Sequence, residues 1–145
     1  MNVQQLSVFL ENKPGRLQKI LQVLKSKKIN ILTLTIAEFT DFGIVRFILD
    51  KPAEAHEALK VEKITCTISE VLGIAIGDEP GDLSKLIDCI YNNGLNIEYM
   101  YAFTEKHEGR PIMLMRFENI EEAKKLLLKE GFEVIKKSDI IGDNK

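Results

Sequence analysis

Apolar positions follow two different periods along the chain, and these periods predict its elements. Residues 3–10 alternate apolar and other side chains, which is the pattern of a half-buried strand. Residues 17–24 place Leu or Ile at positions i, i+3, i+4 and i+7, which predicts a helix with one apolar face. The chain therefore opens with a strand followed by a helix that packs on it.

The same two periods continue to the C-terminus and give a repeated order of elements. The first half continues with predicted strands at 29–36 and 44–49, a helix from Pro52 to Leu59 and a strand at 64–68. The second half has predicted strands at 72–76, 95–103, 113–116 and 132–135, with helices at 83–94 and 120–130. Gly94 is expected to end the first of these helices as its C-terminal cap. We expect the tail at 142–145 to be disordered. Each half thus reads βαββαβ.

An internal duplication explains this order. The same 66 residues separate Gly15 from Gly81 and Asn30 from Asn96, and the sequence around each pair is similar. We therefore expect an α+β protein of two units, residues 1–70 and 71–145, each with an antiparallel sheet and helices on one face.

A Pro-Gly turn stands between the first strand and first helix of each unit. The two turns read Asn12-Lys13-Pro14-Gly15 and Asp78-Glu79-Pro80-Gly81. We expect each Pro at the first helical position, with Asn12 or Asp78 capping the free amides. The Gly would let a small molecule approach, and the helix N-terminus favours an anion such as a carboxylate. A purely structural strand-to-helix turn would carry the same signals.

Composition narrows the functional classes. Apolar residues make up 45% and charged residues 29%, as in soluble globular proteins, and no apolar run is long enough to span a membrane. The first five residues lack the features of an export signal, so we expect a cytoplasmic protein without membrane contact. The net charge of −2 gives no electrostatic basis for binding nucleic acid.

The sequence offers little chemistry of its own. Cys66 and Cys89 have no Cys or His at metal-ligand spacing, and we expect two small apolar side chains without a disulfide. His56 falls in a predicted surface helix and His107 in a charged loop, so both are predicted to be ordinary exposed histidines. We therefore expect no metal, no cofactor and no catalytic activity.

The duplicated motifs resemble those of ACT domains, small regulatory modules with a ferredoxin-like βαββαβ fold. The segments that carry the resemblance are Asn12–Leu17 with Ile29–Ile31, and Asp78–Leu83 with Leu95–Ile97. The resemblance covers nearly the whole chain and implies a tandem pair of ACT domains. It further implies that a small effector, most often an amino acid, binds where the Pro-Gly loop of one unit meets the second strand of its neighbour.

The resemblance also implies a set of ligand-binding positions. Asn12 would bond both ends of an amino acid, whereas Asp78 is better suited to its ammonium group, so the second loop is the favoured one. Amides near Gly15 and Gly81 would receive the carboxylate. The full set is Asn12, Lys13, Pro14, Gly15, Asn30, Ile31, Asp78, Glu79, Pro80, Gly81, Asn96 and Ile97. Within it, Asn30 and Asn96 have an alternative role in fixing the helix-to-strand turn.

These features predict a stand-alone regulatory protein that senses an amino acid, forms a homodimer and acts on a protein partner that the sequence does not identify. Two alternatives remain. A structural dimerisation module without a ligand would have the same packing pattern. An RNA-recognition module shares the βαββαβ order, and residues 43–47 faintly resemble its third-strand motif, but the paired aromatic residues are missing.

Overall fold

The computed structural model describes residues 1–38 and 40–141. It contains two compact units. One consists of Gln4–Ser69, and the other combines Met1–Val3 with the described residues from Glu70 onward. No helix among the described residues is long and apolar enough to cross a bilayer. We refer to the two units as the first and second repeat.

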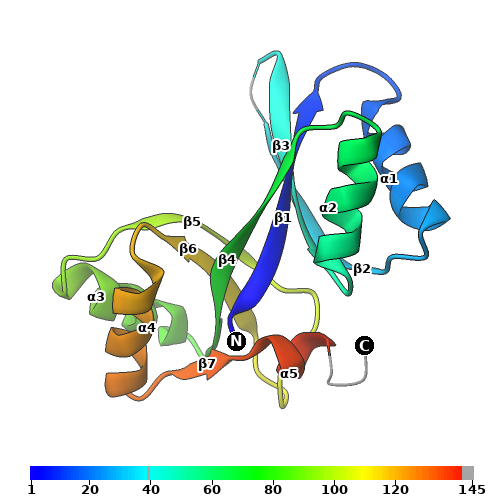
Figure 1. The fold of residues 1–145 in the computed structure, drawn as a ribbon. Helices are drawn as coiled ribbons and strands as arrows, with labels where there is room; N and C mark the ends of the chain where they lie inside the picture. Colours follow the sequence, from blue (N-terminus) through cyan, green and yellow to red (C-terminus); the bar gives the residue numbers. More distant parts are fainter. Residues whose placement is uncertain (39, 142–145) are drawn as a thin grey trace. The chain divides into compact units, whose positions relative to one another are not determined.

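The first repeat is a four-stranded antiparallel sheet with two helices on one face (Figure 1). Its elements are β1 (Val3–Glu11), α1 (Arg16–Ser26), β2 (Ile31–Glu38), β3 (Phe42–Leu49), α2 (Pro52–Val61) and the beginning of β4 (Cys66–Ala75). The strand order is β2-β3-β1-β4. Because paired strand residues share a face, the pairs Leu6–Phe47 and Val8–Val45 both point toward the helices.

The core of the first repeat lies between this sheet face and the apolar faces of α1 and α2. Its buried members are Leu6, Val8, Ile20, Leu24, Ile29, Val45, Phe47, Leu49, Ala55 and Leu59. The helical members of this core recur four residues apart, Ile20 with Leu24 and Ala55 with Leu59, as expected for one apolar helix face. The predicted start of α2 at Pro52 is confirmed, since Pro tolerates the first turn of a helix.

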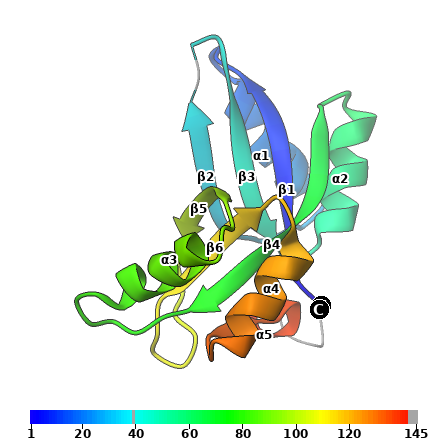
Figure 2. The same ribbon diagram turned by 90° about the vertical axis from the view of Figure 1, so that its left-hand side faces the viewer.

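The second repeat has the same arrangement (Figure 2). Its elements are the rest of β4, α3 (Asp82–Asn92), β5 (Ile97–Ala102), β6 (Ile112–Phe117), α4 (Ile120–Lys129), β7 (Glu133–Ile135) and α5 (Lys137–Ile141). The order β5-β6-β4-β7 repeats that of the first unit. The predicted fold class, two ferredoxin-like βαββαβ repeats with helices on one face, is confirmed.

One expectation about the strands is wrong. The sequence predicts separate strands at 64–68 and 72–76, but the structure has the single strand β4, and the division between the two units falls within it after Ser69. No Gly or Pro interrupts the chain between Ile68 and Val71, so nothing there ends a strand. The short helix α5 was not predicted, and the tail expected to be disordered lies outside the described residues.

Each Pro-Gly turn leads directly into a helix, as predicted, but the expected placement of Pro at the first helical position is wrong. Pro14 and Pro80 precede the helices, and the N-cap positions belong to Gly15 and Gly81, whose φ angles are 85° and 90°. A side chain other than hydrogen is strained at such angles, so the glycines are explained by backbone geometry. Asn12 does not cap α1; its Nδ2 donates to the carbonyl of Thr40 at 3.4 Å.

The helices α1 to α4 share one type of C-terminal ending, in which the residue after the C-cap has a positive φ. These residues are Lys28 (56°), Lys63 (61°), Gly94 (71°) and Gly131 (88°). In α1, the Lys28 amide donates to the Lys25 carbonyl and the Ile29 amide to the Leu24 carbonyl, which is the bonding of a Schellman motif. The second repeat thus has Gly where the first has Lys.

Candidate functional site

The first Pro-Gly loop leaves the N-terminus of α1 open. Among the described residues, α1 receives no side-chain cap, and a methyl group placed on Gly15 would meet no atom within 4 Å. The first amides of a helix have no partner within it. This end of α1 can therefore accept an anion without first displacing a side chain.

A cavity of about 250 Å³ lies beside this loop. Asn12 and Lys13 contribute the polar side of its wall. The apolar side comes from Leu10, Leu17, Ile36 and Phe42, with Glu11 and Gly43 completing the lining. The cavity thus joins a loop that offers amide and ammonium groups to a surface that would suit an aliphatic group.

A second cavity, of about 340 Å³, lies on the other side of the β1 end. Its polar lining includes Arg16 and Lys19 of α1, with Lys63 from the turn after α2. Glu11 pairs with Lys13 at 3.3 Å and with Arg16 at 3.9 Å, so the loop carries its own ion pairs. The surroundings of the first loop therefore contain the cationic groups of Arg16, Lys19 and Lys63 beside the carboxylates of Glu11 and Glu62.

The second Pro-Gly loop has a carboxylate that bonds within the loop, although α3, like α1, has no side-chain cap among the described residues. Asp82, the first residue of α3, accepts a hydrogen bond from the Glu79 amide at 2.9 Å through Oδ2. Its carboxylate also lies against Gly77, where a Cβ would come within 2.1 Å of Asp82 Oδ2. At the matching position of the first repeat stands Arg16. The loops therefore differ in charge at the point where an anion would bind.

Asp78, the position expected to hold an ammonium group, is on the surface of the second loop. Its Oδ2 lies 3.4 Å from Nζ of Lys106, and both side chains are exposed. Exposed ion pairs of this kind contribute little to stability and exchange readily with solvent. An effector ammonium at Asp78 would compete with Lys106.

Within each repeat, the predicted site residues fall at two separate places. Ile31 and Ile97 begin β2 and β5, as expected, but these strands start after the C-termini of α1 and α3. Asn30 and Ile31 line a different cavity, of about 430 Å³, together with Lys25 and Lys28. Because α1 has 11 residues at about 1.5 Å each, this place lies about 16 Å from the Pro-Gly loop.

The two asparagines have different surroundings. The Asn30 amide donates to the Asp50 carboxylate at 2.9 Å, and the Asp50 amide donates to the Asn30 carbonyl at 3.2 Å. On the Asn30 side, both bonds involve main-chain atoms, and the Asn30 side chain is exposed. Asn96 lines a cavity of about 610 Å³ with Gly94, Leu95 and the start of α4.

The two cysteines and two histidines are further side chains that could take part in chemistry. Burial raises the pKa of the Cys66 thiol, and burial together with the Glu130 charge raises the pKa of the Cys89 thiol.

His56 lies in α2 as predicted. His107 is not the exposed histidine expected, because its side chain is only 20% accessible and its Nε2 lies 3.0 Å from the Glu133 carboxylate. No local spacing reveals this contact, since Glu133 lies on a distant strand.

Comparison with known families decides the membership of the chain. The family model described as an ACT domain pair matches residues 1–142. The chain belongs to the ACT domain pair family. ACT domains are regulatory modules that bind small ligands. Membership in the family therefore supports a regulatory, small-ligand-binding role for this ACT domain pair in general. Comparison with curated proteins gave no match.

Solved structures agree with this assignment. Protein BT0572 from Bacteroides thetaiotaomicron is 36% identical, with a TM-score of 0.88 over 97% of this chain and 96% of that one. The aspartate kinase regulatory subunit from Thermus thermophilus is 19% identical, with a TM-score of 0.61 over 90% of this chain and 94% of that one. The subunit from Thermus flavus is 17% identical, with a TM-score of 0.64 over 88% and 90%. The last two show the shared fold.

Proposed function

We propose that this ACT domain pair is a stand-alone regulatory protein that binds an α-amino acid at the first Pro-Gly loop. The observation that carries the proposal is the difference between the two loops at the first residue of the helix. Asp82 places a carboxylate on the second loop, where it bonds the Glu79 amide, whereas the first loop has the cationic Arg16 at that position; neither helix has a side-chain cap among the residues described. A ligand carboxylate would be attracted to the first loop and repelled from the second.

The polar groups beside the first cavity match both ends of an amino acid. The amides at the start of α1 and the Lys13 ammonium would bind the carboxylate. The Asn12 amide oxygen would accept a hydrogen bond from the ligand ammonium, because its Nδ2 already donates to Thr40. The apolar wall of Leu10, Leu17, Ile36 and Phe42 favours an aliphatic side chain.

The other predicted positions would come from a neighbouring unit. Asn30 and Ile31 lie at the far end of α1 from the loop, so one small molecule cannot contact both places in one repeat. We therefore propose that Asn30–Ile31 or Asn96–Ile97 of an adjacent ACT unit completes the site, and that the protein forms a homodimer. In this proposal the chain senses its effector in the cytoplasm, performs no catalysis and passes the signal to a protein partner.

Isothermal titration calorimetry with the common amino acids, supported by thermal unfolding, tests the proposal. A ligand at 100 times its dissociation constant should add about 2.7 kcal/mol to the free energy of unfolding. The pair Asn12→Ala and Asp78→Ala then locates the site, because the two residues hold matching loop positions. We expect Asn12→Ala to weaken binding about tenfold, equal to about 1.4 kcal/mol, and Asp78→Ala to leave it unchanged.

Two results would contradict this. If no amino acid raises the unfolding midpoint, the amino-acid proposal fails and the structural dimerisation role is favoured. If Asp78→Ala weakens binding and Asn12→Ala does not, the ligand occupies the second loop. RNA binding would appear as retention on mixed oligonucleotides that falls with salt, and we expect none for this acidic chain.

A further inference from the structure

A tight hairpin connects β5 to β6 and carries an unusual residue at its tip. His107 and Arg110 exchange two backbone hydrogen bonds, of 2.9 and 3.0 Å, around the two-residue turn Glu108-Gly109. Both turn residues have positive φ, 50° and 77°, which is the geometry of a type I′ turn. Asn, Asp or Gly normally occupies the first of these positions, and a Glu there is strained.

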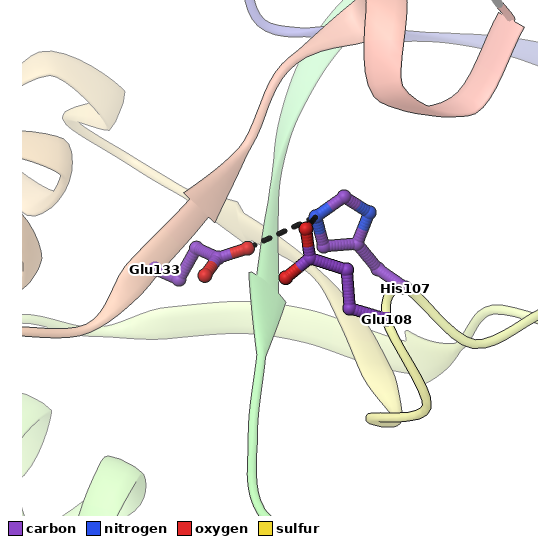
Figure 3. Close-up of side chains that lie close together, drawn as sticks. All are labelled: His107, Glu108 and Glu133. Atoms are coloured by element: carbon purple, nitrogen blue, oxygen red, sulfur yellow. Dashed lines mark ion pairs between the residues drawn. The ribbon is translucent and has the colours of Figure 1, made fainter.

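Three side chains converge beside this hairpin (Figure 3). Nε2 of His107 lies 3.0 Å from Oε2 of Glu133 in β7 and 4.0 Å from Oε1 of Glu108. One ligand atom from each of the three residues can be chosen so that all lie within 4.8 Å of one another. The His107 side chain is partly buried, while the Glu108 and Glu133 carboxylates are more accessible to solvent.

We propose that His107, Glu108 and Glu133 form a binding site for a divalent transition metal, with Zn²⁺ as the best-suited ion. Zinc binds imidazole nitrogen and carboxylate oxygen at about 2.0–2.2 Å, so its tetrahedral ligands stand about 3.4 Å apart. The His107–Glu133 and His107–Glu108 separations, 3.0 and 4.0 Å, lie on either side of that value, and the two carboxylate oxygens lie within 4.8 Å of each other. Rotation of the exposed Glu108 carboxylate with a small displacement of Glu133 would bring the three ligands to that spacing. The fourth position would remain open to water.

Arg110 supports this arrangement from the outer side. Its Nη2 bonds Oε1 of Glu133, which leaves Oε2 directed at His107. Ligating carboxylates usually have such a partner, because it holds the oxygen in position for the metal. The charges of two carboxylates, one guanidinium and one divalent ion leave a net charge of +1, which is tolerable at a solvent-accessible site.

The nitrogen ligand determines the choice of metal. Mg²⁺ prefers oxygen ligands in a near-octahedral arrangement and dehydrates reluctantly, so it gains little from His107. Imidazole with carboxylates suits zinc and its neighbours in the first transition series.

The decisive measurement is a zinc titration of the full chain, followed by two-dimensional NMR of the imidazole rings. The chain has only two histidines, so the two rings are readily distinguished. We expect Zn²⁺ to shift the His107 ring signals and to raise the unfolding midpoint, while Mg²⁺ does neither. His107→Gln and Glu133→Gln should each weaken zinc binding at least tenfold.

His56 and Glu57 provide a matched control. Nδ1 of His56 lies 3.8 Å from the Glu57 carboxylate in α2. This contact joins the same residue types as the His107–Glu133 contact, but the described residues place no third metal ligand beside it. We expect His56→Gln to bind zinc like the wild type. Zinc held by Cys66 or Cys89 would survive both His107→Gln and Glu133→Gln. Zinc binding that persists in both variants would overturn the proposal. Wild-type protein whose His107 ring signals do not respond to zinc would also overturn it, and the three residues would then serve only to hold the hairpin.

Discussion

The C-terminal ends of α1 and α2 give the sharpest test of the fold's energetics. Lys28 and Lys63 occupy positions with φ of 56° and 61°, where the second repeat has Gly94 and Gly131. A left-handed conformation costs an L-residue about 1–2 kcal/mol, and glycine adopts it without that penalty. We predict that Lys28→Gly and Lys63→Gly each stabilise the protein.

The size of the effect follows from two opposing terms. Relief of the left-handed strain contributes about 1–2 kcal/mol, and the greater freedom of glycine in the unfolded chain removes about 0.5–1 kcal/mol. The central values of the two terms give a net gain of about 0.75 kcal/mol at each site, within a range of about 0–1.5 kcal/mol. For a chain of this length, the central value corresponds to a rise of about 2–3 °C in the unfolding midpoint.

Both substitutions should preserve the hydrogen bonds of the helix ending. At Lys28 these bonds come from the backbone amides, and the apolar contact that accompanies them involves Leu24 and Ile29, both buried in the core. The change therefore removes a strained side chain without removing a packing contact. Urea unfolding should show a higher midpoint with an unchanged slope.

Lys27→Gly is the matched control. It removes the same charge from the adjacent C-cap position, whose φ of −97° suits any residue. We expect it to destabilise the protein by up to about 1 kcal/mol, because glycine adds unfolded-state freedom with no strain to relieve. The reasoning is refuted if Lys28→Gly destabilises the protein as much as Lys27→Gly does.

Two further predictions concern other sites. Gly77→Ala should destabilise the protein by about 0.5–1.5 kcal/mol in urea unfolding, because its Cβ would displace the Asp82 carboxylate from its hydrogen bond with the Glu79 amide. In a protein that already carries Asp82→Ala, Gly77→Ala should lose most of this destabilising effect. An equal loss of stability with and without Asp82→Ala would contradict the contact. Because burial raises the pKa of both Cys66 and Cys89, less thiolate forms near pH 8, and alkylation by iodoacetamide should be slower than for a free cysteine and accelerate as the pH rises. Alkylation at the rate of free cysteine would show that these thiols are not protected.

Much of the fold could be predicted from the sequence because its determinants are local. The helical stripe at 17–24 and the alternation at 3–10 predict α1 and β1, and the matched Pro-Gly turns predict the repeat. Gly94 was correctly predicted to end α3, since glycine favours the left-handed position after a helix. The matching left-handed position after α1 could not be predicted, because its residue, Lys28, does not favour that conformation.

The candidate sites depended on tertiary structure. The two loops differ because Asp82 folds back onto the Glu79 amide, a contact that residue types alone do not specify. The His107–Glu133 contact joins a hairpin to a strand that comes 26 residues later, and only the pairing of β7 with β4 brings Glu133 into place.

By itself, the sequence determined most of the elements, the duplication and the family of this ACT domain pair, because periodicity, turn residues and helix endings act over a few neighbouring residues. Only the tertiary structure decided that β4 is one strand, that the Pro-Gly loop and Asn30 lie at opposite ends of α1, and which charges face each loop. The reason is that helix length, strand pairing and side-chain contacts fix distances between residues that are far apart in the chain.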